Sequence, residues 1–104
     1  MMGLPPSIRS VVIPEFGGPE VMRVVERPMP AVGPSDVLVR IAAAGVNRGD
    51  MVQRQGHYPP PAGVTDVPGL EVSGTVVGCG EHVQRWRVGD EVCALLAGGG
   101  YATY

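Results

Sequence analysis

The side chains that could form a metal site or a covalent nucleophile are few in this 104-residue sequence. The thiol and imidazole groups are limited to Cys79, Cys93, His57 and His82, with no C-x-x-C or H-x-x-x-H pair among them. Because a zinc site needs three or four ligands at such spacings, the sequence predicts no metal. Cys93 stands in an apolar run, where a cysteine is typically a small buried hydrophobe. The sequence does not show whether either cysteine approaches a histidine.

A glycine-rich stretch raises the possibility of a phosphate-binding loop. Residues 74–80 read GTVVGCG, whereas the dinucleotide fingerprint has the spacing G-x-G-x-x-G and opens a helix immediately. The next segment, residues 81–90, has no helical period. The pattern therefore favours a twisted strand and its turn over a phosphate cradle.

Two polar side chains are candidates for contact with a ligand. Arg48 stands in the first turn of a predicted helix, whose N-terminus attracts anions, although an ion pair with nearby Asp50 is the favoured local interpretation. Tyr58 follows the same helix beside His57 and three prolines, where its hydroxyl could meet a ligand. An equally good interpretation is that Tyr58 packs its loop onto the protein body.

The elements that position these residues are mostly short strands. The sequence holds 16 glycines and 11 prolines among Val, Ile and Leu runs, a pattern typical of an all-β body with many reversals. One short helix is predicted over residues 47–55, with Asn47 as N-cap, and an irregular loop over 56–69. Strands are predicted over residues 7–14, 21–26, 36–42, 70–77 and 91–96, and residues 101–104 read as the start of another.

Composition excludes several classes of function. The chain has ten acidic residues against eight basic ones, so it lacks the positive field that holds nucleic acid. Its apolar runs fall far short of the roughly 20 residues that span a bilayer, and no signal peptide is recognisable. Two unpaired cysteines without a secretory signal indicate reduced thiols, and we expect a cytoplasmic protein without a membrane partner.

Three blocks of sequence together carry a family resemblance. They are residues 43–50 (AAGVNRGD), 68–74 (PGLEVSG), and 88–92 (VGDEV) with 99–102 (GGYA). The combination resembles the N-terminal catalytic domain of a medium-chain dehydrogenase/reductase. Residues 47–61 and 94–100 are most similar to zinc-independent NAD(P)H quinone oxidoreductases of the tumour-suppressor-inducible type, close to the zeta-crystallin group.

The resemblance implies a mainly β fold, a GroES-like, partly open β-barrel with one short helix. Residues 1–104 would form the substrate-side catalytic domain, and a Rossmann domain that holds most of the NADPH is expected after residue 104. Asn47 would contact the nicotinamide end of the cofactor and Arg48 its pyrophosphate. Tyr58 would contact the nicotinamide or the quinone oxygen and act as catalytic hydrogen-bond donor, with Glu71 as a structural partner. The full-length enzyme would be a homodimer or homotetramer, and this domain alone would bind cofactor weakly.

The sequence departs from the zinc-dependent alcohol dehydrogenase branch at two positions of its metal site and two of its proton relay. Asn47 and Leu70 stand where the resemblance implies a Cys and a His ligand, and Gly49 and Val52 where it implies relay residues. An alcohol needs a Lewis acid and a proton path, whereas a quinone is already an electrophile. The resemblance therefore implies quinone reduction without zinc.

Two alternative functions remain open from the sequence. The same cofactor arrangement could deliver a hydride to a conjugated alkene, which would make the protein an enoyl or double-bond reductase. The barrel could also be a non-enzymatic binding or structural module, as in the co-chaperonin that shares the fold. The RNA binding that the zeta-crystallin resemblance raises fits poorly with the net charge of −2.

Overall fold

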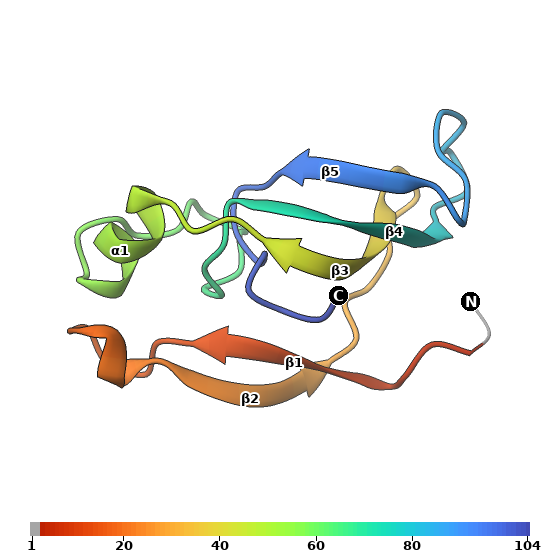
Figure 1. Ribbon diagram of the computed structural model, residues 1–104. Helices are drawn as coiled ribbons and strands as arrows, with labels where there is room; N and C mark the ends of the chain where they lie inside the picture. The colour runs from red at the N-terminus through yellow and green to blue at the C-terminus, as the bar shows by residue number, and fades with distance from the viewer. Residues whose placement is uncertain (1–2) are drawn as a thin grey trace.

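The protein, described over residues 3–104 by a computed structural model, is built from two antiparallel sheets and one short α-helix. The smaller sheet pairs β1 (Ser7–Val12) with β2 (Arg23–Pro28), and the larger has the order β3 (Val37–Ala44), β4 (Glu71–Cys79), β5 (Glu91–Leu95). Helix α1 (Arg48–Arg54) follows β3 and lies beyond the end of the larger sheet (Figure 1). The expected mainly β fold with one short helix is confirmed.

The β1–β2 hairpin differs from the prediction at its turn. We expected the second strand over residues 21–26, but a 3-10 turn, Pro19–Val21, precedes it and the strand runs Arg23–Pro28. Pro19 fixes the first position of this turn, because its ring presets a helical φ and it has no N–H to leave unpaired. The strand therefore begins two residues later than its β-branched pattern suggested.

The C-terminal residues join the two sheets. The backbone N–H of Val11 donates to the Tyr101 carbonyl at 2.8 Å, and the N–H of Thr103 donates to the Arg9 carbonyl at 3.0 Å. On the other side, the N–H of Ile41 donates to the Thr103 carbonyl at 2.9 Å. Residues 101–104 thus lie between β1 and β3 (Figure 1), although the predicted strand start is reduced to one isolated bridge between Ser10 and Ala102.

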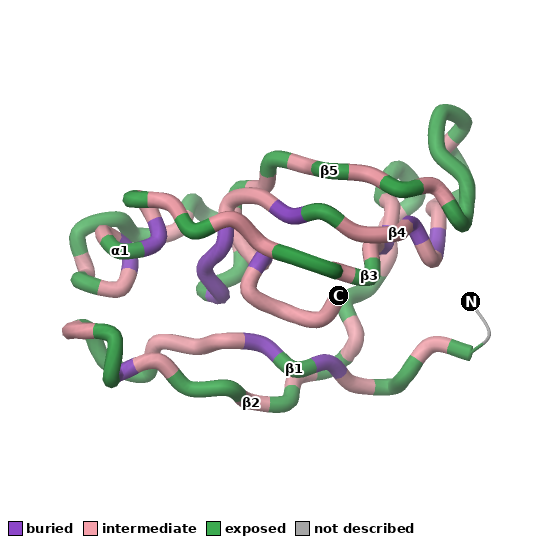
Figure 2. Tube along the Cα trace, in the orientation of Figure 1, coloured by how far each residue is buried: buried purple, intermediate pink, exposed green. Residues whose placement is uncertain are grey.

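The barrel is open along its other side. Within residues 3–104, β2 and β5 each pair with one neighbour only, so no ladder closes the two sheets there. Figure 2 shows buried positions in both sheets and in the segments that connect them, and four of the six buried apolar residues line the space between the sheets. The six are Ile8, Val21, Leu38, Val67, Val72 and Val76. The expected partly open barrel is confirmed.

The cysteine in β5 contradicts its expected burial. Cys93 is exposed, together with Glu91 and Leu95, because β5 is an edge strand and its period of two turns these three side chains outward. By contrast, residues 74–80 lie mostly within β4 and end in a turn, which confirms the strand interpretation of the glycine-rich stretch.

Candidate functional site

The site begins where β3 passes into helix α1. Asn47 is the N-cap of α1, with an extended backbone, and its side-chain Nδ2 donates to Oε1 of Glu71 at 3.1 Å. Glu71 is the first residue of β4, and its carbonyl accepts from the N–H of Gly45. A side chain on Gly45 would overlap the Glu71 carboxylate, so glycine is needed for this close approach. The carboxylate therefore fixes the amide of Asn47, in the structural role expected for Glu71.

Asp50 is the most connected side chain near the site. It is only 5% exposed, and its Oδ2 accepts from the backbone N–H of Asn47 and from the hydroxyl of Tyr101, each at 2.9 Å. Its Oδ1 accepts from the backbone N–H of Gly69 at 3.0 Å. One buried carboxylate thus ties together the start of α1, the end of the 56–69 loop and the C-terminal segment.

This environment changes the acidity of Tyr101. Its phenol is partly buried and donates to a carboxylate, so ionisation would place a second negative charge beside Asp50. Burial, then the hydrogen bond and charge of Asp50, raise the pKa of Tyr101 to about 12. Tyr101 is therefore held as a neutral hydrogen-bond donor to Asp50.

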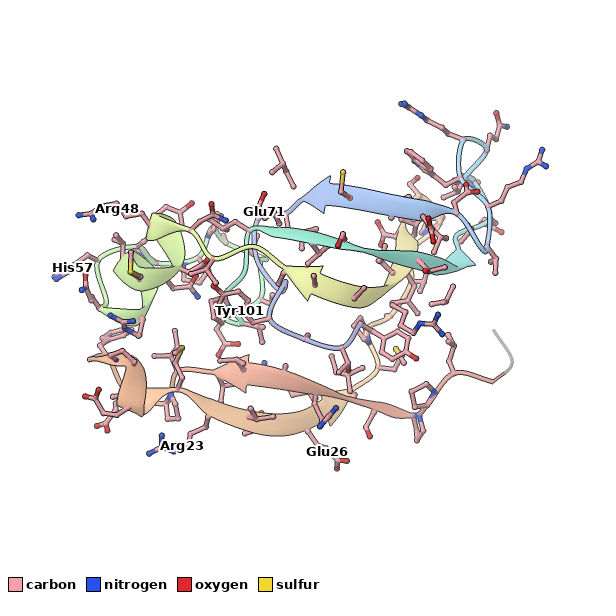
Figure 3. The ribbon with its side chains drawn as sticks, in the orientation of Figure 1. Arg23, Glu26, Arg48, His57, Glu71 and Tyr101 are labelled. Atoms are coloured by element: carbon pink, nitrogen blue, oxygen red, sulfur yellow. The ribbon has the colours of Figure 1, made fainter. Side chains whose placement is uncertain are left out.

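Arg48 does not form the ion pair that local sequence favoured. That interpretation is wrong, because the Asp50 carboxylate turns inward to three other donors and Arg48 points out from α1 (Figure 3). The Arg48 side chain is exposed and has no carboxylate partner among residues 3–104. Its guanidinium is free to meet an external anion.

Tyr58 lies away from the Asn47 end of the helix. It is 42% exposed and lines a small hollow of about 270 Å³ with Phe16, Gln53 and Pro59, among others, after the C-terminus of α1. Neither Asn47 nor Arg48 lines this hollow. Asn47 and Arg48 are thus neighbours at the start of α1, whereas Tyr58 lines a separate hollow beyond the other end of the helix.

The residues at the zinc-ligand positions do not fit a metal. Asn47 offers an amide that is already bonded to Glu71, and Leu70 offers an aliphatic side chain that lies against Gly49. No group of three or more His, Cys, Asp or Glu side chains gathers anywhere in residues 3–104. The donor set around Asn47 therefore lacks the thiolate and imidazole ligands that zinc prefers.

Two residues of this network, Asp50 and Tyr101, were not predicted as site residues. A signal for Asp50 was present, because an Asn N-cap followed three residues later by an acidic residue resembles a capping box. Tyr101 had no local signal, since it is 51 residues from Asp50 in the chain and meets it only in the fold.

The alcohol dehydrogenase GroES-like domain family matches residues 33–104, which include the whole Asp50 network. The chain belongs to this family. The match to this family confirms both the GroES-like barrel and the resemblance to the medium-chain dehydrogenases/reductases. Among residues 3–104 of the domain, no helix has the length and apolar character to cross a membrane.

Relatives of this GroES-like domain carry two kinds of name. The synaptic vesicle membrane protein VAT-1 homolog of Rattus norvegicus is 41% identical over 98 residues, which cover 90% of this chain and 24% of that protein. The quinone oxidoreductase of Lama guanicoe is 37% identical over 101 residues, covering 93% of this chain and 30% of the relative. The solved structure of the human VAT-1 homolog-like protein has a TM-score of 0.85 and 33% identity, covering 93% of this chain and 31% of that one.

The GroES-like domain thus spans about a quarter to a third of the length of these relatives. The predicted similarity to quinone oxidoreductases is confirmed. The similarity to VAT-1 homologs was not predicted from the sequence.

Proposed function

We propose that this GroES-like domain is the substrate-side domain of an NADPH-dependent quinone oxidoreductase that works without zinc. The observation that carries the proposal is the hydrogen bond between the side chains of Asn47 and Glu71. The family resemblance implies a metal ligand of the zinc-dependent branch at the position of Asn47, and the amide found here is already hydrogen-bonded to a carboxylate. The identity of 37% to a quinone oxidoreductase of Lama guanicoe supports the same substrate class.

The proposed chemistry is compatible with a site that has no Lewis acid. A quinone becomes a hydroquinone by taking up one hydride and a proton, and NADPH supplies the hydride when it is bound. The quinone carbonyl is already electrophilic, so the protein has to orient it and stabilise the charge that develops on its oxygen. Hydrogen-bond donors suffice for that task.

Asn47 and Arg48 are the residues of this domain that would hold the cofactor. The Arg48 guanidinium is exposed and free of carboxylates among residues 3–104, and its planar set of donors matches a pyrophosphate. Asn47 is held in place by Glu71, which would fix its position toward the nicotinamide end. The donor chemistry at this end of α1 therefore fits an anionic dinucleotide.

Tyr58 is the proposed hydrogen-bond donor to the quinone oxygen. Tyr101 cannot take this role, because its hydroxyl is engaged by Asp50 and its pKa is raised to about 12. The Tyr58 side chain is 42% exposed, and its hydroxyl makes no hydrogen bond within residues 3–104, which leaves it free for a ligand. Its loop, residues 56–69, would have to present it toward the bound quinone.

The proposal extends to the protein as a whole. Residues 1–104 would form one domain, and a Rossmann domain that holds most of the NADPH would follow residue 104. We expect the full-length protein to be a cytoplasmic homodimer or homotetramer. Its partners would be quinones or other small conjugated carbonyl compounds, without nucleic acid or membrane.

Treatment of the full-length protein with a chelator tests the absence of zinc. We expect NADPH oxidation by 1,4-benzoquinone to be unchanged after EDTA treatment and gel filtration, because no group of three or more His, Cys, Asp or Glu side chains gathers within residues 3–104. The readout is the loss of NADPH absorbance at 340 nm. Loss of activity that zinc restores would contradict the proposal, and faster turnover of enones than of quinones would favour the reductase alternative.

Replacement of the Tyr58 hydroxyl tests its role in the same assay. Tyr58→Phe should lower kcat on the order of 10²-fold with little change in KM, because a donor to the developing oxyanion acts mainly in the transition state. Tyr104→Phe is the control, since it removes a hydroxyl elsewhere in the barrel. An unchanged kcat in Tyr58→Phe would show that Tyr58 only packs its loop.

A further inference from the structure

A second hollow lies between helix α1 and the β1–β2 hairpin, which face each other in Figure 1. Its volume is about 500 Å³. Small-molecule sites in proteins typically have roughly 300 to 1,000 Å³. Asn47, Arg48 and Tyr58 do not line this hollow, so it is separate from the contacts proposed for NADPH and quinone.

Most of the wall of this hollow is apolar, and part of it is exposed. Val24, Val46 and Met51 line it, and they are three of the eight large apolar side chains that are exposed among residues 3–104. The rest of the apolar wall consists of Val11, Pro19, Met22 and Pro68. Apolar area that gathers in one place is a sign of a binding site, whereas scattered exposed residues are not. An apolar molecule in the hollow would cover side chains that are otherwise open to water.

Arg54, in the last turn of α1, adds a positive charge to this wall. Its Nε donates to the Gly17 carbonyl at 3.0 Å, which fixes the guanidinium at the hairpin. Its other N–H groups have no acceptor within residues 3–104. They are accessible, because the Ser10 hydroxyl is the one side-chain group of these residues that is both shielded from solvent and unpaired. Arg54 therefore brings a fixed and reachable set of donors to the hollow.

The other charged side chains at the wall do not compete for this position. Asp50 lies four residues before Arg54, a spacing that favours an ion pair on a helix, but its carboxylate accepts from three other donors and the pair does not form. The Arg23 guanidinium donates to the carbonyls of Glu20 and Met22 and points away from α1 (Figure 3). Arg54 is thus the guanidinium of this hollow that is free to hold a ligand.

We propose that the hollow binds a small molecule with an apolar body and one carboxylate, which accepts hydrogen bonds from the guanidinium of Arg54. The planar donors of a guanidinium match the two oxygens of a carboxylate. The apolar body would lie along Val24, Val46 and Met51. A phosphate fits less well, because its second negative charge would face the buried carboxylate of Asp50 in the same wall. This inference does not depend on the proposed quinone reduction.

The test compares two probes of equal shape on the complete chain. Octanoate carries the carboxylate, and octanamide has an uncharged amide in its place. We expect saturable changes in the amide NMR signals of Val24, Val46 and Met51 with octanoate. Octanamide should bind about 10-fold more weakly, because hydrogen bonds between two ionised groups are stronger than those to a neutral acceptor.

Substitution of Arg54 identifies the group that recognises the carboxylate. Arg54→Met keeps a long side chain without its charge, so it should weaken octanoate binding about 10-fold and leave octanamide binding unchanged. Arg54→Lys retains the charge without the planar donors and should fall between Arg54→Met and the parent chain. Arg40→Met is the control, because Arg40 is exposed on β3 and does not line the hollow. A thermal unfolding curve for each variant shows that it is folded.

Three outcomes would overturn the inference. The first is the absence of saturable signal changes at Val24, Val46 and Met51 with octanoate. The second is equal affinity of the parent chain for octanoate and octanamide, a comparison that needs no variant to fold. The third is an equal effect of Arg54→Met on the two probes, which would mean that the guanidinium does not recognise the carboxylate.

Discussion

Gly69→Ala should destabilise the protein by about 4 kcal/mol, the combined effect of a strained φ and an overpacked contact. Gly69 has a φ of +109°, and a Cβ there would lie 2.5 Å from the backbone nitrogen of Tyr101 and 2.6 Å from the Cα of Gly100. These neighbours are backbone atoms held by hydrogen bonds, including Gly100 N–H to the Gly69 carbonyl at 3.0 Å. The contact therefore cannot be relieved by a side-chain rotation.

Gly63→Ala is the matched control for this prediction. Gly63 also has a positive φ, +81°, but a Cβ there meets no atom within 4 Å. The Gly63→Ala substitution should lower the free energy of unfolding by only about 1 kcal/mol, which is the effect of the backbone conformation alone. Urea denaturation followed by circular dichroism gives both values. Equal destabilisation by the two substitutions would show that the contact of Gly69 with the C-terminal segment is not tight.

Asp50→Ala should be nearly as damaging, with a loss of about 3 to 5 kcal/mol in the free energy of unfolding. The change leaves three donors without their acceptor, namely the N–H groups of Asn47 and Gly69 and the hydroxyl of Tyr101. Tyr101→Phe removes one of these donors together with its need for a partner, so it should cost about 1 kcal/mol. If the two variants prove equally stable, Asp50 does not hold these segments together.

The pH dependence of stability provides a second measurement on the same network. The pKa of Tyr101 is raised from 10.0 to about 12 in the folded protein, so the neutral phenol favours the folded state. This contribution is complete below pH 10 and is lost as the pH rises to about 12. Tyr101→Phe should flatten the fall in stability over this interval, and an unchanged alkaline profile would contradict the assignment.

Much of the fold was predictable because its signals are local. Alternating apolar residues identified β3, and the Asn N-cap identified α1 within a residue of its bounds. The error at β2 came from Pro19, whose preference for a helical turn competed with the β-branched run that follows. Cys93 was misplaced because sequence alone did not show that β5 is an edge strand with an exposed face.

The candidate site was predictable only where a family motif marked it. The blocks around Asn47 and Glu71 carried the family resemblance, and in the fold the side chains of these two residues form a hydrogen bond with each other. Asp50 was assigned to Arg48, its neighbour on the helix, because local spacing was the only guide. In the fold, the Asp50 carboxylate instead accepts hydrogen bonds from donors in three different segments. Because Asp50 is buried and Arg48 is exposed, the two side chains do not pair.

By itself, the sequence determined the mainly β character of this protein, its single short helix, its family and the absence of metal ligands at the positions of Asn47 and Leu70. These properties depend on residue types and on spacings within one element. Tertiary structure alone decided that residues 101–104 join the two sheets, that Asp50 holds Tyr101, and that the Ser10 hydroxyl is buried. Each of these contacts joins segments far apart in the chain, so it depends on how the sheets pack and leaves no periodic pattern in the sequence.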